Sequence, residues 1–342
     1  MFGFLIRHVP ATLPRRESSC AMAILIQRRA WNRDFRNAGL LSALLLAFSG
    51  LPVLTGAGQE PPTPASTARP PAKPAAAKPP WGRIVMVGAS ASAGFTESEP
   101  LGGPTTPQYC LSRYVDAALL VPHEPVRNLA HAMFFVNAEA AGRYQIDQAL
   151  NARPTLVIGV DFLFWFCYGD GPADKDRLQR FEKGLKLLEA VQCPLVVGDI
   201  PDASGAADSA LDADQIPSSE AMSAANRRLK EWAARRPHVV IVSLSGFMRA
   251  ALANQALTLH GHTLEEGKTR MLLQSDKLHP SPPGCAVLAL AVLDAFESGR
   301  PAASAGEVRW DPKDVFRLAF KPQSEPPGHP TKQLRPSVPA GN

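Results

Sequence analysis

The sequence predicts an α/β protein built as a three-layer α/β/α sandwich around a five-stranded parallel sheet. Short apolar runs of strand length recur along the chain, and segments with helical spacing of apolar residues lie between them. Continuous apolar strands that alternate with helices are typical of a parallel sheet covered on both faces. The expected strands lie in residues 83–88, 124–130, 154–160, 193–199 and 238–244, and the expected helices in 108–120, 136–150, 174–192, 218–235 and 284–298.

The distribution of proline divides the 342-residue chain into one core domain and flanking segments. Single hydrophobic cores stop growing near about 250 to 300 residues, so we expect one core domain, residues 82–300. The Pro/Ala-rich residues 58–81 are expected to form a linker. Residues 301–342 are expected to be a partly disordered tail whose apolar residues between 308 and 320 dock on the domain.

The N-terminal residues 1–57 have the layout of a signal peptide or an N-terminal anchor. Arginines precede an apolar run at residues 39–54, and small residues follow it. The run is shorter than the roughly 20 residues that a membrane-spanning helix needs, which favours a signal over an anchor. We therefore expect a protein exported to the periplasm or the extracellular space, tethered to the membrane if this segment is not cleaved.

The positive charge of the chain belongs to this same segment. The net charge is +5, and residues 1–57 carry seven arginines against Glu17 and Asp34, which accounts for all of it. The rest of the chain is near neutral, so its composition does not indicate a nucleic-acid partner. Transient association with a membrane or the cell envelope stays open, and so does the oligomeric state.

The first predicted strand opens into a loop of small residues, 88–94, with the sequence GASASAG. Ligands of open parallel sheets bind beyond the carboxyl ends of the strands, so this loop is a candidate site. Ser90 at its first bend could be a nucleophile, the loop could cradle a phosphate, or it could be a tight turn. Neither GxGxxG nor Gly-Lys-Ser/Thr is present here, which disfavours a nucleotide.

A distant segment favours the nucleophile. Asp276 and His279 lie three residues apart, directly before Pro280. His279 would take the proton from Ser90 and return it to the leaving group, while Asp276 would orient the ring and stabilise the imidazolium. Taken alone, Asp-x-x-His is also typical of a helix cap beside a surface histidine.

With these residues the chain resembles the SGNH or GDSL hydrolases, a family of serine esterases and lipases. Gly88-Ala89-Ser90 is similar to the first motif of the family, with Ala89 in place of the usual aspartate, and residues 276–281 are similar to the last motif. The resemblance covers roughly residues 83–298. It implies a flavodoxin-like fold and an acyl-serine mechanism that needs no metal or organic cofactor. The implied substrate is a small-molecule or glycan ester.

The two middle motifs depart from the family pattern, and both departures concern the oxyanion hole. Ala130 stands where the resemblance implies a glycine, and its backbone N–H could join that of Ser90 as an oxyanion donor. Asp161 stands where the family has an asparagine amide, but an ionised carboxylate cannot donate. Either Asp161 is protonated, or it faces elsewhere, or hydrolysis is weak. Its other interpretation is an N-cap of the following helix.

Three further features have two interpretations each. The aromatic residues after the third strand could wall an apolar acyl pocket or pack the core. The long polar stretch 199–217 is expected to be a substrate lid rather than a simple connection. His260 and His262 could bind a metal only with a third ligand, which the sequence does not show, so a solvated loop is favoured. The aromatic residues are Phe162, Phe164, Trp165, Phe166 and Tyr168.

The leading hypothesis is thus an exported SGNH-like serine esterase. Two alternatives stay open. An SGNH-fold binding module with weak or no turnover would fit the change at Asp161, and an acyltransferase acting on a cell-envelope glycan would use the same residues.

Overall fold

The computed structural model describes residues 80–171, 173–298 and 306–320. The interpretations of residues 1–57 as a signal or anchor and of most of residues 58–81 as a linker lie outside the described residues.

A five-stranded sheet forms the centre of the domain, and all of its strand pairs are parallel. The strand order is β2-β1-β3-β4-β5, which is the flavodoxin-like order. The predicted three-layer α/β/α sandwich with a five-stranded parallel sheet is therefore confirmed. The strands are β1 (Ile84–Met86), β2 (Arg127–Asn128), β3 (Leu156–Gly159), β4 (Leu195–Gly198) and β5 (Val239–Val242).

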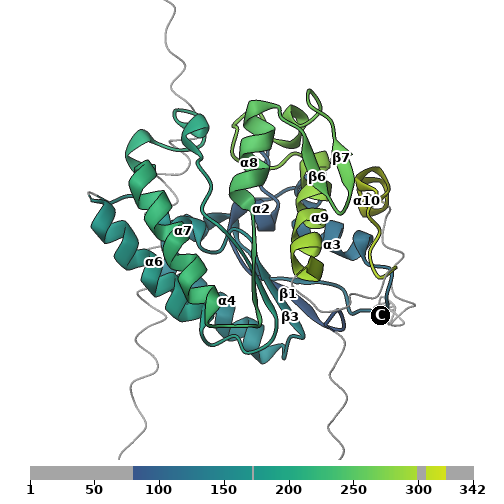
Figure 1. Ribbon diagram of the computed structural model, residues 1–342, viewed down its shortest axis with the longest axis horizontal. Coiled ribbons are helices and arrows are strands. Elements are labelled where there is room, and N and C mark those ends of the chain that lie inside the picture. Colours follow the sequence, from purple (N-terminus) through teal and green to yellow (C-terminus); the bar gives the residue numbers. More distant parts are fainter. Residues whose placement is uncertain (1–79, 172, 299–305, 321–342) are drawn as a thin grey trace, which may run out of the picture. The chain divides into compact units, whose positions relative to one another are not determined.

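Helices cover both faces of the sheet (Figure 1). On one face α4 packs on α6, and α6 packs on α7. On the other face α3, α9 and α10 pack against one another. The helices are α3 (Leu111–Ala118), α4 (Ala138–Asn151), α6 (Asp174–Leu188), α7 (Ser219–Ala234), α9 (Pro282–Ser298) and α10 (Pro312–Ala319).

The burial of these elements follows from their sequences. β1, β3 and β4 are buried at every position, as expected for strands covered on both faces. α4 buries Gly142, Gln145, Ile146 and Ala149, whose three- and four-residue spacing forms one helical face. α9 is buried at every position from 284 to 293, because it contacts β5 on one side and α3 and α10 on the other.

Residues 306–320 extend the domain beyond its predicted end at 300. Arg309 donates its backbone N–H to Ala118 at 2.7 Å, and Leu120 donates to Glu307 at 2.8 Å. Val308 and Val315 are buried. The expectation that the apolar residues of this segment dock on the domain is confirmed for these two side chains.

The elements that were not predicted include one longer helix and a hairpin. α8 (Leu244–Ala253) begins directly after β5, and a hairpin of β6 (Leu257–Leu259) and β7 (His262–Leu264) follows it. Among the helices in the described part of the chain, none has both the length and the apolar character of a membrane span.

Candidate active site

The nucleophile turn, residues 88–93, lies at the carboxyl end of β1, an interior strand of the sheet. The chain passes through Gly88 at φ +142° and enters the short helix α2 (Ser90–Ala93). A Cβ at residue 88 would lie 2.1 Å from Oδ1 of Asp161, so the position requires glycine. Gln145 of α4 fixes the same residue, because its side chain accepts from the Gly88 N–H at 2.7 Å and donates to the Gly88 carbonyl at 2.9 Å. Ser90 is thereby held at the first turn of α2.

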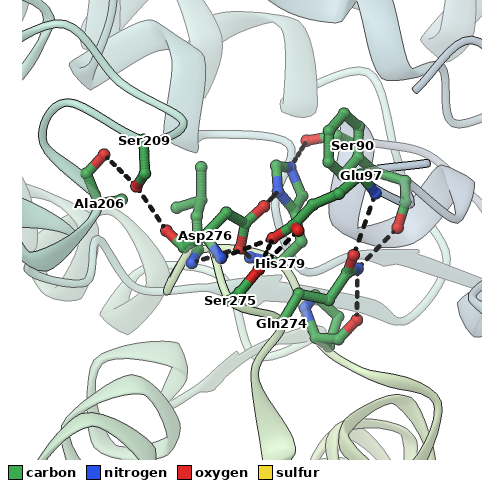
Figure 2. Close-up of polar contacts among 11 residues, drawn as sticks. Ser90, Glu97, Ala206, Ser209, Gln274, Ser275, Asp276 and His279 are labelled. Atoms are coloured by element: carbon green, nitrogen blue, oxygen red, sulfur yellow. Dashed lines mark hydrogen bonds and ion pairs between the residues drawn. The ribbon is translucent and has the colours of Figure 1, made fainter. Parts of the chain in front are cut away.

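The structure brings Asp276 and His279 to this serine (Figure 2). Nε2 of His279 lies 2.7 Å from Oγ of Ser90, and Nδ1 lies 2.6 Å from Oδ2 of Asp276. All three side chains are buried. A nucleophile hydrogen-bonded to a base that is itself hydrogen-bonded to an orienting carboxylate is the arrangement that activates a serine hydroxyl. The residues that the sequence singled out for catalysis therefore lie together.

Residues 273–281, the histidine loop, lie directly before α9 and hold Asp276 in its orientation. Oδ1 of Asp276 accepts the backbone N–H groups of Leu278 and His279, both at 3.0 Å. Lys277 adopts φ +58°, a left-handed conformation that lets the chain turn tightly between the two catalytic candidates. One oxygen of the carboxylate is thus hydrogen-bonded to the backbone, and the other is hydrogen-bonded to the imidazole.

The pKa of the Asp276 carboxyl lies below its ordinary value of 3.8. Burial by itself would raise this pKa, because it disfavours the charged form. The hydrogen bond and charge of His279, together with the N–H groups of Leu278 and His279, outweigh burial and lower the pKa. Asp276 is therefore ionised at neutral pH and available to stabilise an imidazolium.

We expect Asp276→Asn to lower kcat for ester hydrolysis by on the order of 10³- to 10⁴-fold and to leave a small residual activity. The amide cannot stabilise the imidazolium, and its NH₂ group favours the wrong imidazole tautomer.

Because the folded-state pKa of Asp276 is depressed, its contribution to the free energy of unfolding is present above pH 4 and is lost as the pH falls below that value. Melting curves of the wild type and the variant should therefore differ at pH 7 and converge below pH 4, whereas a constant difference would contradict this.

Residues just after α2 connect the nucleophile turn to the histidine loop (Figure 2). The ring of Phe95 stacks on His279, with 3.9 Å between ring centroids and 24° between planes. The Glu97 carboxylate accepts the backbone N–H of Asp276 and the hydroxyl of Ser275, both at 2.6 Å. Gln274 donates to the carbonyl of Phe95 at 2.8 Å. These contacts fix the imidazole and the residues before it from the nucleophile side, and no motif in the sequence indicates them.

Neither of the two unusual oxyanion candidates, Asp161 and Ala130, has a hydrogen-bond donor free for an oxyanion in the structure. The Asp161 carboxylate accepts hydrogen bonds from residues 89 and 92 of the nucleophile turn. The backbone N–H of Ala130 donates to Oδ1 of Asn128 at 3.0 Å. The interpretation of Asp161 as N-cap of the following helix is wrong, because Leu163 holds the N-cap position of α5 (Phe164–Cys167). The backbone N–H of Ser90 stays the predicted oxyanion donor.

An apolar pocket opens beside Ser90 and His279 and encloses about 460 Å³ of space, part of which is its open mouth. Phe164 and Trp165 line it, whereas Phe162, Phe166 and Tyr168 belong to the buried core. The predicted aromatic cluster thus divides between the two roles considered for it. Further apolar walls come from Leu244, Phe247 and Met248 of α8 and from Leu278 of the histidine loop. Among the described residues that line the pocket, none is a lysine or arginine.

The stretch 199–217, predicted to be a lid, contributes to this site. Pro201 lines the pocket, and the hydroxyl of Ser209 donates to the carbonyl of Asp276 at 3.0 Å. The Tyr168 hydroxyl donates to the carbonyl of Pro201 at 2.7 Å and fixes the start of the stretch. Part of the predicted lid is therefore a wall of the pocket and a support of the histidine loop.

The two remaining histidine candidates lie at the tip of the β6–β7 hairpin. His260 adopts φ +46° and stacks on Trp310, with 3.9 Å between ring centroids. His262 pairs with Leu259 in the hairpin and is exposed. Within residues 80–171, 173–298 and 306–320, no three His, Cys, Asp or Glu side chains are grouped as a metal site would require.

Comparisons with known proteins give fold-level likenesses. Neither a family model nor a curated protein matches the sequence. A solved lipase/acylhydrolase from Enterococcus faecalis is 18% identical, with a TM-score of 0.44, and the match covers 65% of this chain and all of that one. An alpha/beta hydrolase enzyme from the metagenome of Lake Arreo is 17% identical, with a TM-score of 0.38, over 64% of this chain and 97% of that one. TesA is 16% identical, with a TM-score of 0.37, over 64% of this chain and 99% of that one. Likenesses of this size carry no functional argument, so a function has to be argued from the site itself.

Proposed function

We propose that this protein is a carboxylic ester hydrolase that works through an acyl-serine intermediate. The observation that carries the proposal is the continuous chain of hydrogen bonds from Ser90 Oγ through the imidazole of His279 to the carboxylate of Asp276. This chain lies at the carboxyl ends of the strands and at the mouth of an apolar pocket, where α/β proteins bind their ligands.

The proposed reaction follows from the role of each atom. Ser90 Oγ attacks the carbonyl carbon of the ester while Nε2 of His279 accepts the hydroxyl proton, and the carbonyl oxygen becomes an oxyanion near the backbone N–H of Ser90. His279 then gives the proton to the leaving alcohol, and the acyl group stays on Ser90. Water attacks the acyl-serine while His279 again accepts the proton, and His279 returns that proton to Ser90 Oγ as the acid is released.

The walls of the pocket favour an apolar acyl group. Phenyl, indole and aliphatic side chains form most of its surface, and its two charged or titratable groups, Asp161 and His279, are already hydrogen-bonded. Such a surface suits a hydrocarbon chain and offers no cation to an acidic acyl group. A sugar would find few hydroxyl partners inside it, so a glycan substrate would place its acyl group in the pocket and its sugar outside.

We expect Met248→Trp to lower kcat/KM for p-nitrophenyl hexanoate at least tenfold more than for p-nitrophenyl acetate. Met248 lies in a pocket wall, and a larger ring there removes space that a longer chain needs; the loss of contact for even one methylene is worth about tenfold or more. Initial rates with both esters test this. Arg249→Trp, which places the same ring at an exposed position of α8, should change neither rate. Equal losses for the two esters would contradict the placement of the acyl group.

Turnover is the test of the proposed function. The purified protein should hydrolyse p-nitrophenyl acetate and butyrate above the rate of buffer alone, and a folded protein without turnover would favour the binding-module alternative. Parallel assays with an added alcohol acceptor separate hydrolysis from acyl transfer.

We also propose that the enzyme is exported. The support for export is the apolar run at residues 39–54, which arginines precede.

A further inference from the structure

Asp161 is the buried carboxyl group at the site whose role the reaction leaves unexplained. It follows β3, is 5% exposed and stands where the family resemblance implies an oxyanion-donating amide. Its carboxylate lies against the turn that carries Ser90. Its hydrogen bonds go to Ala89 and Ser92 of that turn and not to Ser90 itself. What it does there is shown by its partners.

All three hydrogen bonds to the Asp161 carboxylate come from residues that flank the nucleophile. Oδ1 accepts the backbone N–H of Ala89 at 3.0 Å and the hydroxyl of Ser92 at 2.6 Å. Oδ2 accepts the backbone N–H of Ser92 at 3.0 Å. The carboxylate therefore spans the turn from the residue before Ser90 to the second residue after it.

These contacts replace a cap that the helix itself lacks. Ala89 is the N-cap residue of α2, and no side chain within the helix caps its first turn. A capping box satisfies the N–H groups of the N-cap and N3 residues, and Asp161 accepts from those same two residues, Ala89 and Ser92. A four-residue helix has few internal bonds to fix its first turn, so the orientation of Ser90 depends on this external carboxylate.

We infer that Asp161 is a positioning residue that braces the nucleophile turn and not an oxyanion donor. Gln145 fixes Gly88 on one side of Ser90, and Asp161 fixes residues 89 and 92 around it. The brace needs a carboxylate, because three donors converge on its two oxygens. An amide has a single acceptor oxygen, and its NH₂ group would face a backbone N–H.

This inference rests on the proposed esterase reaction and predicts the opposite sign from a donor role. If Asp161 occupied the place of a missing oxyanion amide, Asp161→Asn would restore that donor and raise kcat. A brace predicts that Asp161→Asn lowers kcat by on the order of 10²-fold through misplacement of Ser90, with KM changed less than about twofold. Steady-state kinetics with p-nitrophenyl butyrate separate the two.

A matched control lies away from the pocket, at the start of α7. Asp174 accepts the hydroxyl and the backbone N–H of Ser218, the N-cap residue of α7, at 2.6 Å and 3.5 Å. Asp174→Asn should lower the melting temperature but leave kcat unchanged. An equal loss of kcat in both variants would show that Asp161 is merely structural and would overturn the inference.

Ser92→Ala tests the brace without changing the carboxylate. It removes the shortest of the three bonds and should lower kcat by about tenfold. An Asp161→Asn enzyme as fast as the wild type, or a Ser92→Ala enzyme with unchanged kcat, would overturn the brace and leave the esterase proposal intact. A wild type without turnover would overturn both.

Discussion

Replacing Ser90 with alanine should abolish ester hydrolysis, with a loss of kcat of on the order of 10⁴-fold or more and little change in stability. The hydroxyl is the atom that forms the acyl bond, and no other group can take its place in the geometry around His279. In the structure Oγ of Ser90 bonds to Nε2 of His279, so its removal leaves the packing of α2 unchanged. The rates of p-nitrophenyl acetate and butyrate hydrolysis, together with a melting curve, measure the two effects separately.

Ser219→Ala is the control for this variant. Ser219 is exposed at the start of α7, where its hydroxyl contacts Glu220, and its loss should not affect turnover. Retained hydrolysis in Ser90→Ala, at a rate above that of buffer, would refute the acyl-serine mechanism.

His279→Ala should remove activity to a similar degree. Without the imidazole, Ser90 has no base to accept its proton on attack, and the leaving alcohol has no acid to protonate it. The same change removes the ring on which Phe95 stacks. We therefore expect some loss of melting temperature in addition to the loss of kcat, as for other large-to-small changes at buried sites.

Two comparisons isolate the chemical role of His279 from its packing. His262→Ala removes an exposed imidazole from the hairpin and should leave turnover unchanged. Phe95→Ala removes the same stacking contact but keeps the imidazole, so its kcat should lie well above that of His279→Ala. Equal kcat values for Phe95→Ala and His279→Ala would contradict the assignment of the imidazole as the base.

The sheet and its main helices could be predicted from the sequence because buried strands and helices have regular patterns of apolar residues. Runs such as residues 154–160 are apolar at nearly every position, which a strand covered on both faces requires. The same pattern places Ser90 at the end of β1, and the short spacing of Asp276 and His279 places both on one loop. Ligand sites of such sheets lie beyond the carboxyl ends of the strands. Ser90, Asp276 and His279 could therefore be assigned to one site from the sequence alone.

α8 and the β6–β7 hairpin were missed because their local sequence signals are weak. Ser243 is the N-cap residue of α8, and Ser245 and Gly246 fall in its first turn, so these small residues are typical of a loop at the end of a strand as well as of a helix start. The β6–β7 hairpin has strands of three residues each, too short to show alternation. Its two turn residues, His260 and Gly261, have positive φ angles; a residue other than glycine is uncommon at such a position, so His-Gly is a weak turn signal.

The supporting residues of the site could not be predicted because each acts through a contact between distant parts of the chain. Glu97 bonds to Asp276 and Gln145 bonds to Gly88, and neither pair shares a spacing or motif. Asp161 was noticed only as a departure from the expected amide. Its actual partners, Ala89 and Ser92, follow from the close approach of β3 and β1, which a single sequence does not specify.

The most direct test of the central claim is the reaction of the protein with a serine-reactive phosphonate, followed by mass spectrometry of its peptides. We expect one adduct per chain on the peptide that contains Ser90, formed at a rate that falls sharply in His279→Ala, together with loss of ester hydrolysis as labelling proceeds. A folded protein that forms no adduct, or forms it on a residue other than Ser90, would contradict the claim that this turn presents an activated nucleophile.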